Sequence, residues 1–299
     1  MGGTFRASFS EAVITPPIGV YLGGYAARLK PSMGLHDDLK VRSLSIEMDG
    51  EAAILVSCDL LAVNNEIVRD SRKLIEDHIE LEEDRILIAA THTHSGPDIV
   101  IPFKEETNGA WKEILKRQIA GCAIDAYNSM EEALAASGLG EVHIGFNRRR
   151  KDGPIDPQLG LLRIDKASKQ PLAALINYAC HPVVLGSDNL LISADYPGFA
   201  VRNFEEFMRI RGKKLKALFF NGACGDINPA TSRGYICAGT FRDAERIGSI
   251  IAAEALKVYE KLEPKKPEKF KAASLTLDLP VREAPPREEA ERKLKEKKD

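Results

Sequence analysis

Two histidines only two residues apart, His92 and His94, have the types and spacing that most clearly suggest chemistry. They lie in the sequence THTHSGP, directly after the apolar run Ile86–Ala90. Side chains alternate along extended backbone, so a strand that continues to this point directs both imidazoles to one side. Gly96 and Pro97 then end the regular structure. The pattern predicts a buried strand that carries two imidazoles to its carboxyl end; the alternative is two ordinary polar loop residues.

Three further polar clusters follow apolar runs in the same way. One is NYACHP, in which His181 precedes a proline. Another is NGACGDINP, which contains Asp226 and Asn228, and whose glycines let the backbone approach a ligand and direct N–H groups at negative charge. The last is FNRRR, which contains Arg148 and is followed by Asp156. All four clusters are therefore candidates for one site.

Histidines from separate strands, with carboxylates available, are typical of a zinc site with nitrogen and oxygen ligands. Such an ion lowers the pKa of a bound water to about 7 and polarises a carbonyl group. The spacing alone is less specific than a motif such as H-E-x-x-H. From the residues alone two classes stay open, a metal hydrolase and a histidine acid–base enzyme without metal.

The elements that must position these clusters alternate between strand and helix patterns. Apolar runs and alternation predict strands over 40–46, 52–57, 86–90, 141–146, 160–165, 172–179, 215–220 and 270–279. Helical spacing predicts helices over 64–79, 110–135 (one helix or two joined ones), 196–211 and 242–262, and the first fifty residues are otherwise interpreted as loop-rich. The order indicates an α/β fold with helices flanking a β-sheet core and catalytic residues at strand ends. We expect a mixed sheet, because the strands between 141 and 179 follow one another without helices.

From Arg282 onward the chain is almost wholly charged. We therefore expect one catalytic domain over residues 1–280 and a charged helical or disordered tail over 281–299. No internal repeat is visible in the sequence.

The composition limits which binding partners and which cellular compartment we expect for the protein. The 299 residues are 44% hydrophobic and 29% charged, and a net charge of -2 gives no electrostatic case for nucleic acid or an anionic membrane. No stretch approaches the ~20 apolar residues of a transmembrane segment. The first residues contain no apolar secretory leader, and the five cysteines form no C-x-x-C pair. These features predict a cytoplasmic protein with reduced thiols, and they leave the oligomeric state open.

Taken in order, the motifs resemble those of the neutral/alkaline (non-lysosomal) ceramidase family. The THTHSGP sequence at 91–97 is similar to the signature of that family. Other similar motifs follow the same order as in the family: ITP (14–16), GY (24–25), LHD (35–37), NR (147–148), DP (156–157), NYACHP (177–182), SADYPG (193–198) and GD (225–226). The resemblance covers roughly residues 10 to 260.

That family consists of zinc amidases that cleave the N-acyl bond of ceramide to release sphingosine and a fatty acid. The resemblance implies a ceramidase-like catalytic domain with Zn2+ as cofactor and a small-molecule or lipid amide as substrate. It implies that His92 and His181 are zinc ligands, and that His94 and Arg148 polarise the scissile carbonyl or stabilise the oxyanion. It also implies that the loop with Asp226 lines the site beside the metal-bound nucleophile.

The sequence departs from the family pattern in two places. The family loop reads G-D-x-S-P, whereas Asn228 stands here at the serine position, and an amide donates hydrogen bonds but is not a nucleophile. The family also completes its zinc shell with a later Glu and Tyr that have no convincing match here, which predicts a C-terminally truncated or divergent member. If the chain is not a fragment, Asp59 or Asp226 is the candidate for the missing carboxylate ligand. Two alternatives remain: a metal hydrolase of another small amide or ester, and an inactive ceramidase-like scaffold or binding protein.

Overall fold

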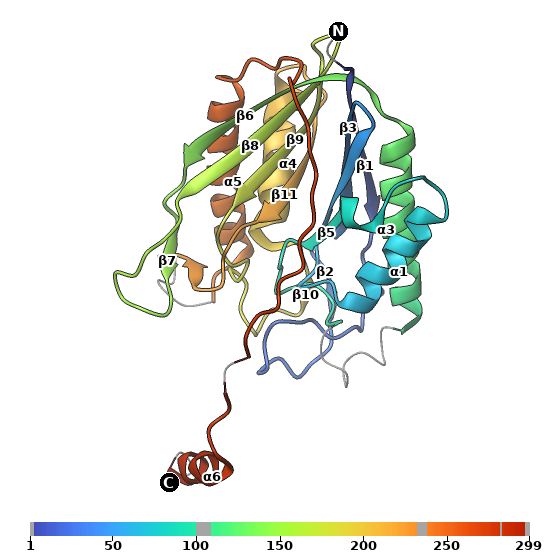
Figure 1. The fold of residues 1–299 in the computed structure, drawn as a ribbon. Helices are drawn as coiled ribbons and strands as arrows, with labels where there is room; N and C mark the ends of the chain where they lie inside the picture. The colour runs from blue at the N-terminus through green and yellow to red at the C-terminus, as the bar shows by residue number, and fades with distance from the viewer. Residues whose placement is uncertain (1–2, 100–108, 232–237, 282, 297–299) are drawn as a thin grey trace.

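The computed structural model describes residues 3–99, 109–231, 238–281 and 283–296 (Figure 1). Its core is an eight-stranded mixed sheet in the order β11-β9-β8-β6-β1-β3-β4-β5. The β4–β5 and β9–β11 pairs are parallel, and the other neighbouring pairs are antiparallel. The strands are β1 (Phe5–Val13), β3 (Lys40–Met48), β4 (Glu51–Cys58), β5 (Ile86–Ala90), β6 (Glu131–Glu141), β8 (Gln158–Lys166), β9 (Pro171–Tyr178) and β11 (Lys216–Asn221).

Two short ladders lie outside this sheet. One pairs β2 (Gly34–Leu35) with β10 (Leu191–Ile192), and the other pairs β7 (Gly145–Asn147) with β12 (Ile227–Pro229). The helices are α1 (Asn65–Glu76), α3 (Gly109–Asn128), α4 (Asp195–Ile210), α5 (Phe241–Tyr259) and α6 (Arg287–Glu296), with one 3-10 turn over Glu83–Arg85.

The sheet consists of two four-stranded halves that face each other. Only two residue pairs join β1 to β6, whereas β1 and β3 share nine. Leu44 of β3 and Leu218 of β11 belong to one buried cluster between the halves. The Ser57 hydroxyl of β4 donates to the Phe219 carbonyl of β11 across 2.6 Å. The two halves thus contribute their inner faces to a common core.

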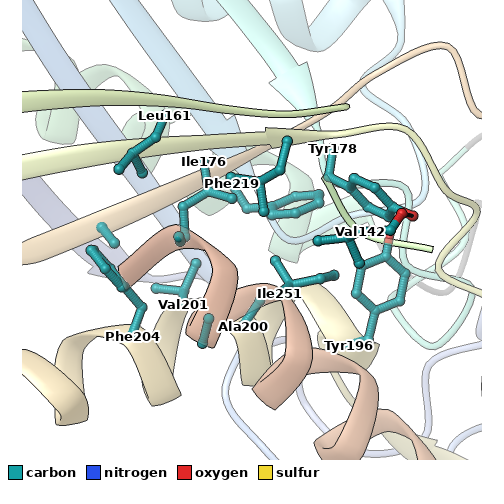
Figure 2. Packing of buried hydrophobic residues seen from close by; sticks show 14 of the residues in the cluster. Val142, Leu161, Ile176, Tyr178, Tyr196, Ala200, Val201, Phe204, Phe219 and Ile251 are labelled. Carbon is teal, nitrogen blue, oxygen red and sulfur yellow. Dashed lines mark hydrogen bonds between the residues drawn. The ribbon is translucent and has the colours of Figure 1, made fainter. Parts of the chain in front are cut away.

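Helices cover the outer face of each half (Figure 1). Apolar residues of α1 and α3 pack on β3, β4 and β5, and those of α4 and α5 pack on β8, β9 and β11. Figure 2 shows the second of these clusters, in which Val201 and Phe204 of α4 point towards Ile176 and Phe219 of the sheet. The chain is therefore built as helix, sheet, sheet and helix layers, and the predicted mixed sheet with flanking helices is confirmed.

Four predicted elements differ in the structure. The helix expected over 110–135 ends at Asn128, and β6 (Glu131–Glu141) replaces its last turns. The strand expected over 141–146 coincides only with the last residue of β6 and the start of β7. The loop-rich N-terminus contains the nine-residue strand β1. The strand expected over 270–279 is wrong, because that segment has no regular secondary structure and no pairing partner.

The C-terminal helix α6 has no buried residue, and it is supported by ion pairs one turn apart, such as Arg287 to Glu291 at 2.8 Å. The division of the chain at residue 280 stays a prediction. In the described part of the chain, no helix is both long and apolar enough to cross a membrane. The thiols of Cys58 and Cys122 are buried and free, Cys180 is buried, Cys224 is free and half-buried, and Cys237 lies outside the described residues.

Candidate metal centre

The predicted histidines meet at the carboxyl ends of the parallel strand pairs. His92 follows β5 and His181 follows β9, and parallel neighbours bring such strand ends to one edge of the sheet. Two hydrogen bonds join the segments there. The Asn221 side chain at the end of β11 donates to the Thr91 carbonyl across 3.1 Å, and the His94 amide donates to the Pro182 carbonyl across 3.2 Å.

Three imidazoles converge at this edge. The Nε2 atoms of His92 and His181 lie 3.0 Å apart, and the Nε2 atom of His94 lies 3.4 Å from that of His92. One ring nitrogen from each of the three lies within 4.8 Å of the others, which makes this a group able to hold a metal ion. The structure therefore brings together residues separated by almost ninety positions.

Main-chain carbonyls fix which nitrogen of two rings carries the proton. His92 Nδ1 lies 2.6 Å from the Leu61 carbonyl oxygen, and His181 Nδ1 lies 2.6 Å from that of Cys224. A carbonyl only accepts, so each Nδ1 donates its proton, and the Nε2 of a neutral ring is left with a lone pair. Two lone pairs 3.0 Å apart repel unless a cation lies between them, and histidine ligands of metals are oriented by this kind of contact. The donor set and its tautomers fit a zinc ion.

His94 shares this group but has a different environment. Its Nδ1 is buried without a hydrogen-bond partner among the described residues, and burial, reinforced by the neighbouring His92 and His181, lowers the pKa of His94 to about 3. Burial also lowers the pKa of His181 to about 4, although the Cys224 carbonyl opposes the shift. Neutral imidazole is the form that binds metal. His94 thus lies close enough to act as a third nitrogen ligand, and its separate role at the substrate carbonyl stays a prediction.

Unusual backbone geometry brings the rings together. His92 has φ +74°, a left-handed conformation that is rare outside glycine and concentrated at functional sites. Gly24 has φ +90°, and a Cβ atom there would lie 2.2 Å from His94 Nδ1. The Tyr25 ring lies edge-on to the His94 ring, with the two ring centroids 5.0 Å apart. Only glycine allows the loop to approach the His94 ring this closely.

Arg148, Asp226 and Asn228 lie in segments that contact the His181 loop. The Arg148 guanidinium donates twice to the Gly225 carbonyl, across 3.1 and 2.7 Å. The Asp226 carboxylate accepts from the Asn147 side chain across 2.8 Å. Asn228 is buried in β12, opposite Phe146 of β7. The predicted roles of these three residues stay predictions.

No carboxylate completes the group among the residues that the structure describes. Asp59 instead pairs with the buried Arg42 at 2.9 Å and accepts from the Lys40 amide. The suggestion that Asp59 or Asp226 joins the metal therefore finds no support in the geometry. Sequence reasoning missed the carbonyls of Leu61 and Cys224 because any residue type supplies a carbonyl.

Comparison with known proteins shows which proteins the chain resembles. No family model matches the chain. Neutral ceramidase B of Dictyostelium discoideum is 26% identical over 246 residues, which cover 73% of this chain and 34% of that protein. Neutral ceramidase of Pseudomonas aeruginosa is 26% identical over 256 residues, covering 75% of this chain and 37% of that protein. The crystal structure of the Pseudomonas aeruginosa enzyme matches with a TM-score of 0.76 at 21% identity, covering 87% of this chain and 45% of that one.

The chain is neutral ceramidase-like. The resemblance predicted from the motifs is thereby confirmed, and the mixed α/β architecture is that of the solved neutral ceramidase. The matched part is similar to an N-terminal portion of these proteins, and it spans only about a third of the length of the curated relatives.

Proposed function

We propose that this neutral ceramidase-like chain is a zinc-dependent amidohydrolase that cleaves an N-acyl amide bond. The observation that carries the proposal is the convergence of three imidazole nitrogens, two of which, on His92 and His181, are left with facing lone pairs by the carbonyls that bind Nδ1. His92 and His181 would hold the ion, with His94 beside them. When bound, zinc supplies Lewis acidity and lowers the pKa of a water ligand.

The protein groups around this centre supply binding and charge stabilisation. Arg148 is held by the Gly225 carbonyl, so its positive charge is fixed beside the loop after β11, whose Cys224 carbonyl contacts His181. A fixed cation of this kind stabilises the negative oxygen that develops when an amide carbonyl is attacked. The neutral His94 ring, buried against Tyr25, is suited to donate to or orient the same carbonyl.

For the substrate we propose a lipid amide, with ceramide, which would yield sphingosine and a fatty acid, as the first candidate. Neutral ceramidases are the relatives that the chain resembles, and the loop that carries Gly24 exposes three large apolar side chains. Ile18 is 62% exposed, Leu29 78% and Met33 71%. Exposed apolar side chains near a candidate site favour an apolar partner.

A second candidate is the hydrolysis of a smaller amide or ester. Asn228 favours it, because this buried amide stands where the family motif has serine and cannot act as a nucleophile. The third possibility, an inactive scaffold, predicts metal binding without turnover. We also propose a cytoplasmic location, which the free, buried thiols of Cys58 and Cys122 support.

Metal analysis of the purified chain tests the proposal. We expect near one zinc per chain, and its loss when His92 and His181 are both changed to glutamine. His143→Gln is the matched control, because the side chain of that histidine is 64% exposed and outside the group. A wild-type chain that binds no zinc under saturating conditions refutes a metal hydrolase.

A substrate panel then separates the candidates. Fluorescent N-acylsphingosine is compared with short N-acyl amides and esters on the zinc-loaded chain. Turnover of only the short substrates rejects ceramide and retains the chemistry. Zinc binding without any turnover favours the scaffold.

A further inference from the structure

Arg28 is a buried cation that joins three loops around the histidines. Its residue is 2% exposed, and its Nη1 atom donates to the Gly23 carbonyl across 2.9 Å and to the His94 carbonyl across 2.7 Å. Its Nη2 atom donates to the Gly186 carbonyl across 3.0 Å. Burial lowers the pKa of the Arg28 guanidinium, which shows that the charge is held at a cost in solvation.

Each of the three carbonyls belongs to a segment that places an imidazole. Gly23 precedes Gly24, whose backbone packs on the His94 ring. The second carbonyl is that of His94 itself. Gly186 lies in the segment that continues from His181, and Tyr25 is tied to the same segment by a 2.9 Å hydrogen bond from its hydroxyl to the Leu185 carbonyl. One side chain thus spans the N-terminal loop and both histidine-bearing loops.

We propose that Arg28 is a positioning residue that sets where the His94 ring stands relative to His92 and His181. The guanidinium acts through backbone carbonyls, so it fixes loop spacing without touching the imidazole nitrogens. The inference about ring placement stands by itself, and only its effect on zinc affinity rests on the proposed function.

The geometry requires arginine rather than any cation. A guanidinium presents donors on separate nitrogens in a rigid plane, and here two of those nitrogens serve three carbonyls on different loops. A lysine ammonium offers its donors from one atom and reaches fewer of the three. Arg28→Lys should therefore retain the charge and rescue only part of the effect.

Zinc affinity provides the first test, measured by competition with a chromophoric chelator. We expect Arg28→Met to weaken binding about 10–100-fold, the range typical for losing groups that orient metal ligands, with Arg28→Lys between it and wild type. Arg163→Met is the matched control. Arg163 also donates to two carbonyls, those of Tyr259 and Leu262, and lies over the Tyr259 ring. It belongs to β8 and not to the loops that carry the histidines. It should lower stability and leave zinc affinity unchanged.

Amide hydrogen exchange of the metal-free chain provides a readout that needs neither zinc nor activity. Arg28→Met should speed exchange at least about tenfold in peptides covering residues 21–27 and 183–190, whereas Arg163→Met should not. If Arg28→Met fails to fold, Arg28→Lys is used for the same comparison. Wild-type exchange and wild-type zinc affinity in a folded Arg28 variant overturn the inference. Faster exchange in a chain that binds no zinc at all upholds it and refutes only the metal hydrolase.

Discussion

Replacing Gly24 by alanine adds a single methyl group against the His94 ring. The new Cβ atom would lie 2.2 Å from His94 Nδ1, 2.4 Å from Cγ and 2.9 Å from Cε1. An ordinary contact begins at 3.4 Å, so the ring or the loop has to move by about 1.2 Å. The ring cannot yield freely, because Nε2 on its other side faces His92 at 3.4 Å and the His94 carbonyl is bound by Arg28.

The structure offers a control with the same backbone cost and no clash. Gly19 has φ +102°, close to the +90° of Gly24, and a Cβ atom there meets nothing within 4 Å. Each alanine should cost about 1–2 kcal/mol from its left-handed backbone. For a chain of this size that lowers Tm by about 2–3 °C. Gly24→Ala should carry the cost of its clash in addition to this shared backbone cost, and only Gly24→Ala should disturb the site.

A displacement of about 1 Å at a reacting centre costs on the order of 100-fold in rate, or about 2.7 kcal/mol of barrier. We expect Gly24→Ala to lower kcat/KM by about that factor, on whichever amide or ester the chain cleaves, while Gly19→Ala keeps wild-type turnover. In parallel, cobalt-substituted protein should show an altered visible spectrum only for Gly24→Ala. Equal activity of the two variants, or equal loss, would show that the contact between Gly24 and His94 does not govern the site.

Three further predictions concern stability and substrate. Asp59→Asn should lower the free energy of unfolding in urea by about 3 kcal/mol, because the buried Arg42 then loses the carboxylate that it contacts at 2.9 Å. The Glu11 carboxylate, 3.7 Å from Arg42, is too distant to replace it. Burial raises the pKa of Asp195 from its usual 3.8 to about 7, so the folded state retains a proton that the unfolded state has lost. That contribution to stability is complete below about pH 4 and is lost as the pH rises to about 7, and urea titrations of Asp195→Asn should show a weaker decline across this window. Leu29→Ser combined with Met33→Ser should raise KM several-fold for a long-chain N-acyl substrate and leave a short-chain substrate unchanged, and an equal change for both would exclude a contact with the apolar chain.

The strands that carry the site could be predicted because each is a short apolar run with a polar end. β5 and β11 contain ILIAA and KALFFN, short apolar runs in which Ile and Phe have high strand propensity. β1 was missed because FRASFSEAV is only weakly apolar, and its strand depends on nine pairs with β3. Pairing of this kind is a tertiary effect that local sequence does not encode.

β6 is a second strand that local sequence does not predict. Its sequence EEALAASGLGE favours a helix at its start and a turn later, yet it forms nine pairs with β8. Its glycines are required by packing: a Cβ at Gly140 would lie 2.2 Å from a Glu254 carboxylate oxygen and 2.8 Å from Val258, both on α5. Conversely, Leu275, Leu277 and Leu279 alternate as a strand would, but they are 80%, 68% and 80% exposed and pair with nothing described. Periodicity predicts a strand only where a partner is present.

For the site, the sequence supplied the imidazoles and the family resemblance, and the structure supplied what orients them. The Nδ1 atoms of His92 and His181 are held by carbonyls of Leu61 and Cys224, so substitution of either of those side chains leaves the contact in place. The tautomers that create a metal site are therefore insensitive to side-chain changes at the contact itself. They are sensitive instead to whatever moves the loops.

That sensitivity lies in residues outside the group of three histidines. Gly24 allows a close approach that any side chain prevents, and Arg28 ties the His94 carbonyl to two other loops. The Asp59 pair with Arg42 fixes the end of β4, two residues before the carbonyl that orients His92. A relative with all three histidines but without these groups should have the ligands and lack the geometry. The three histidines are thus necessary for the proposed activity, but their presence alone does not predict it. The presence of the histidines together with Gly24 and Arg28 should predict the activity.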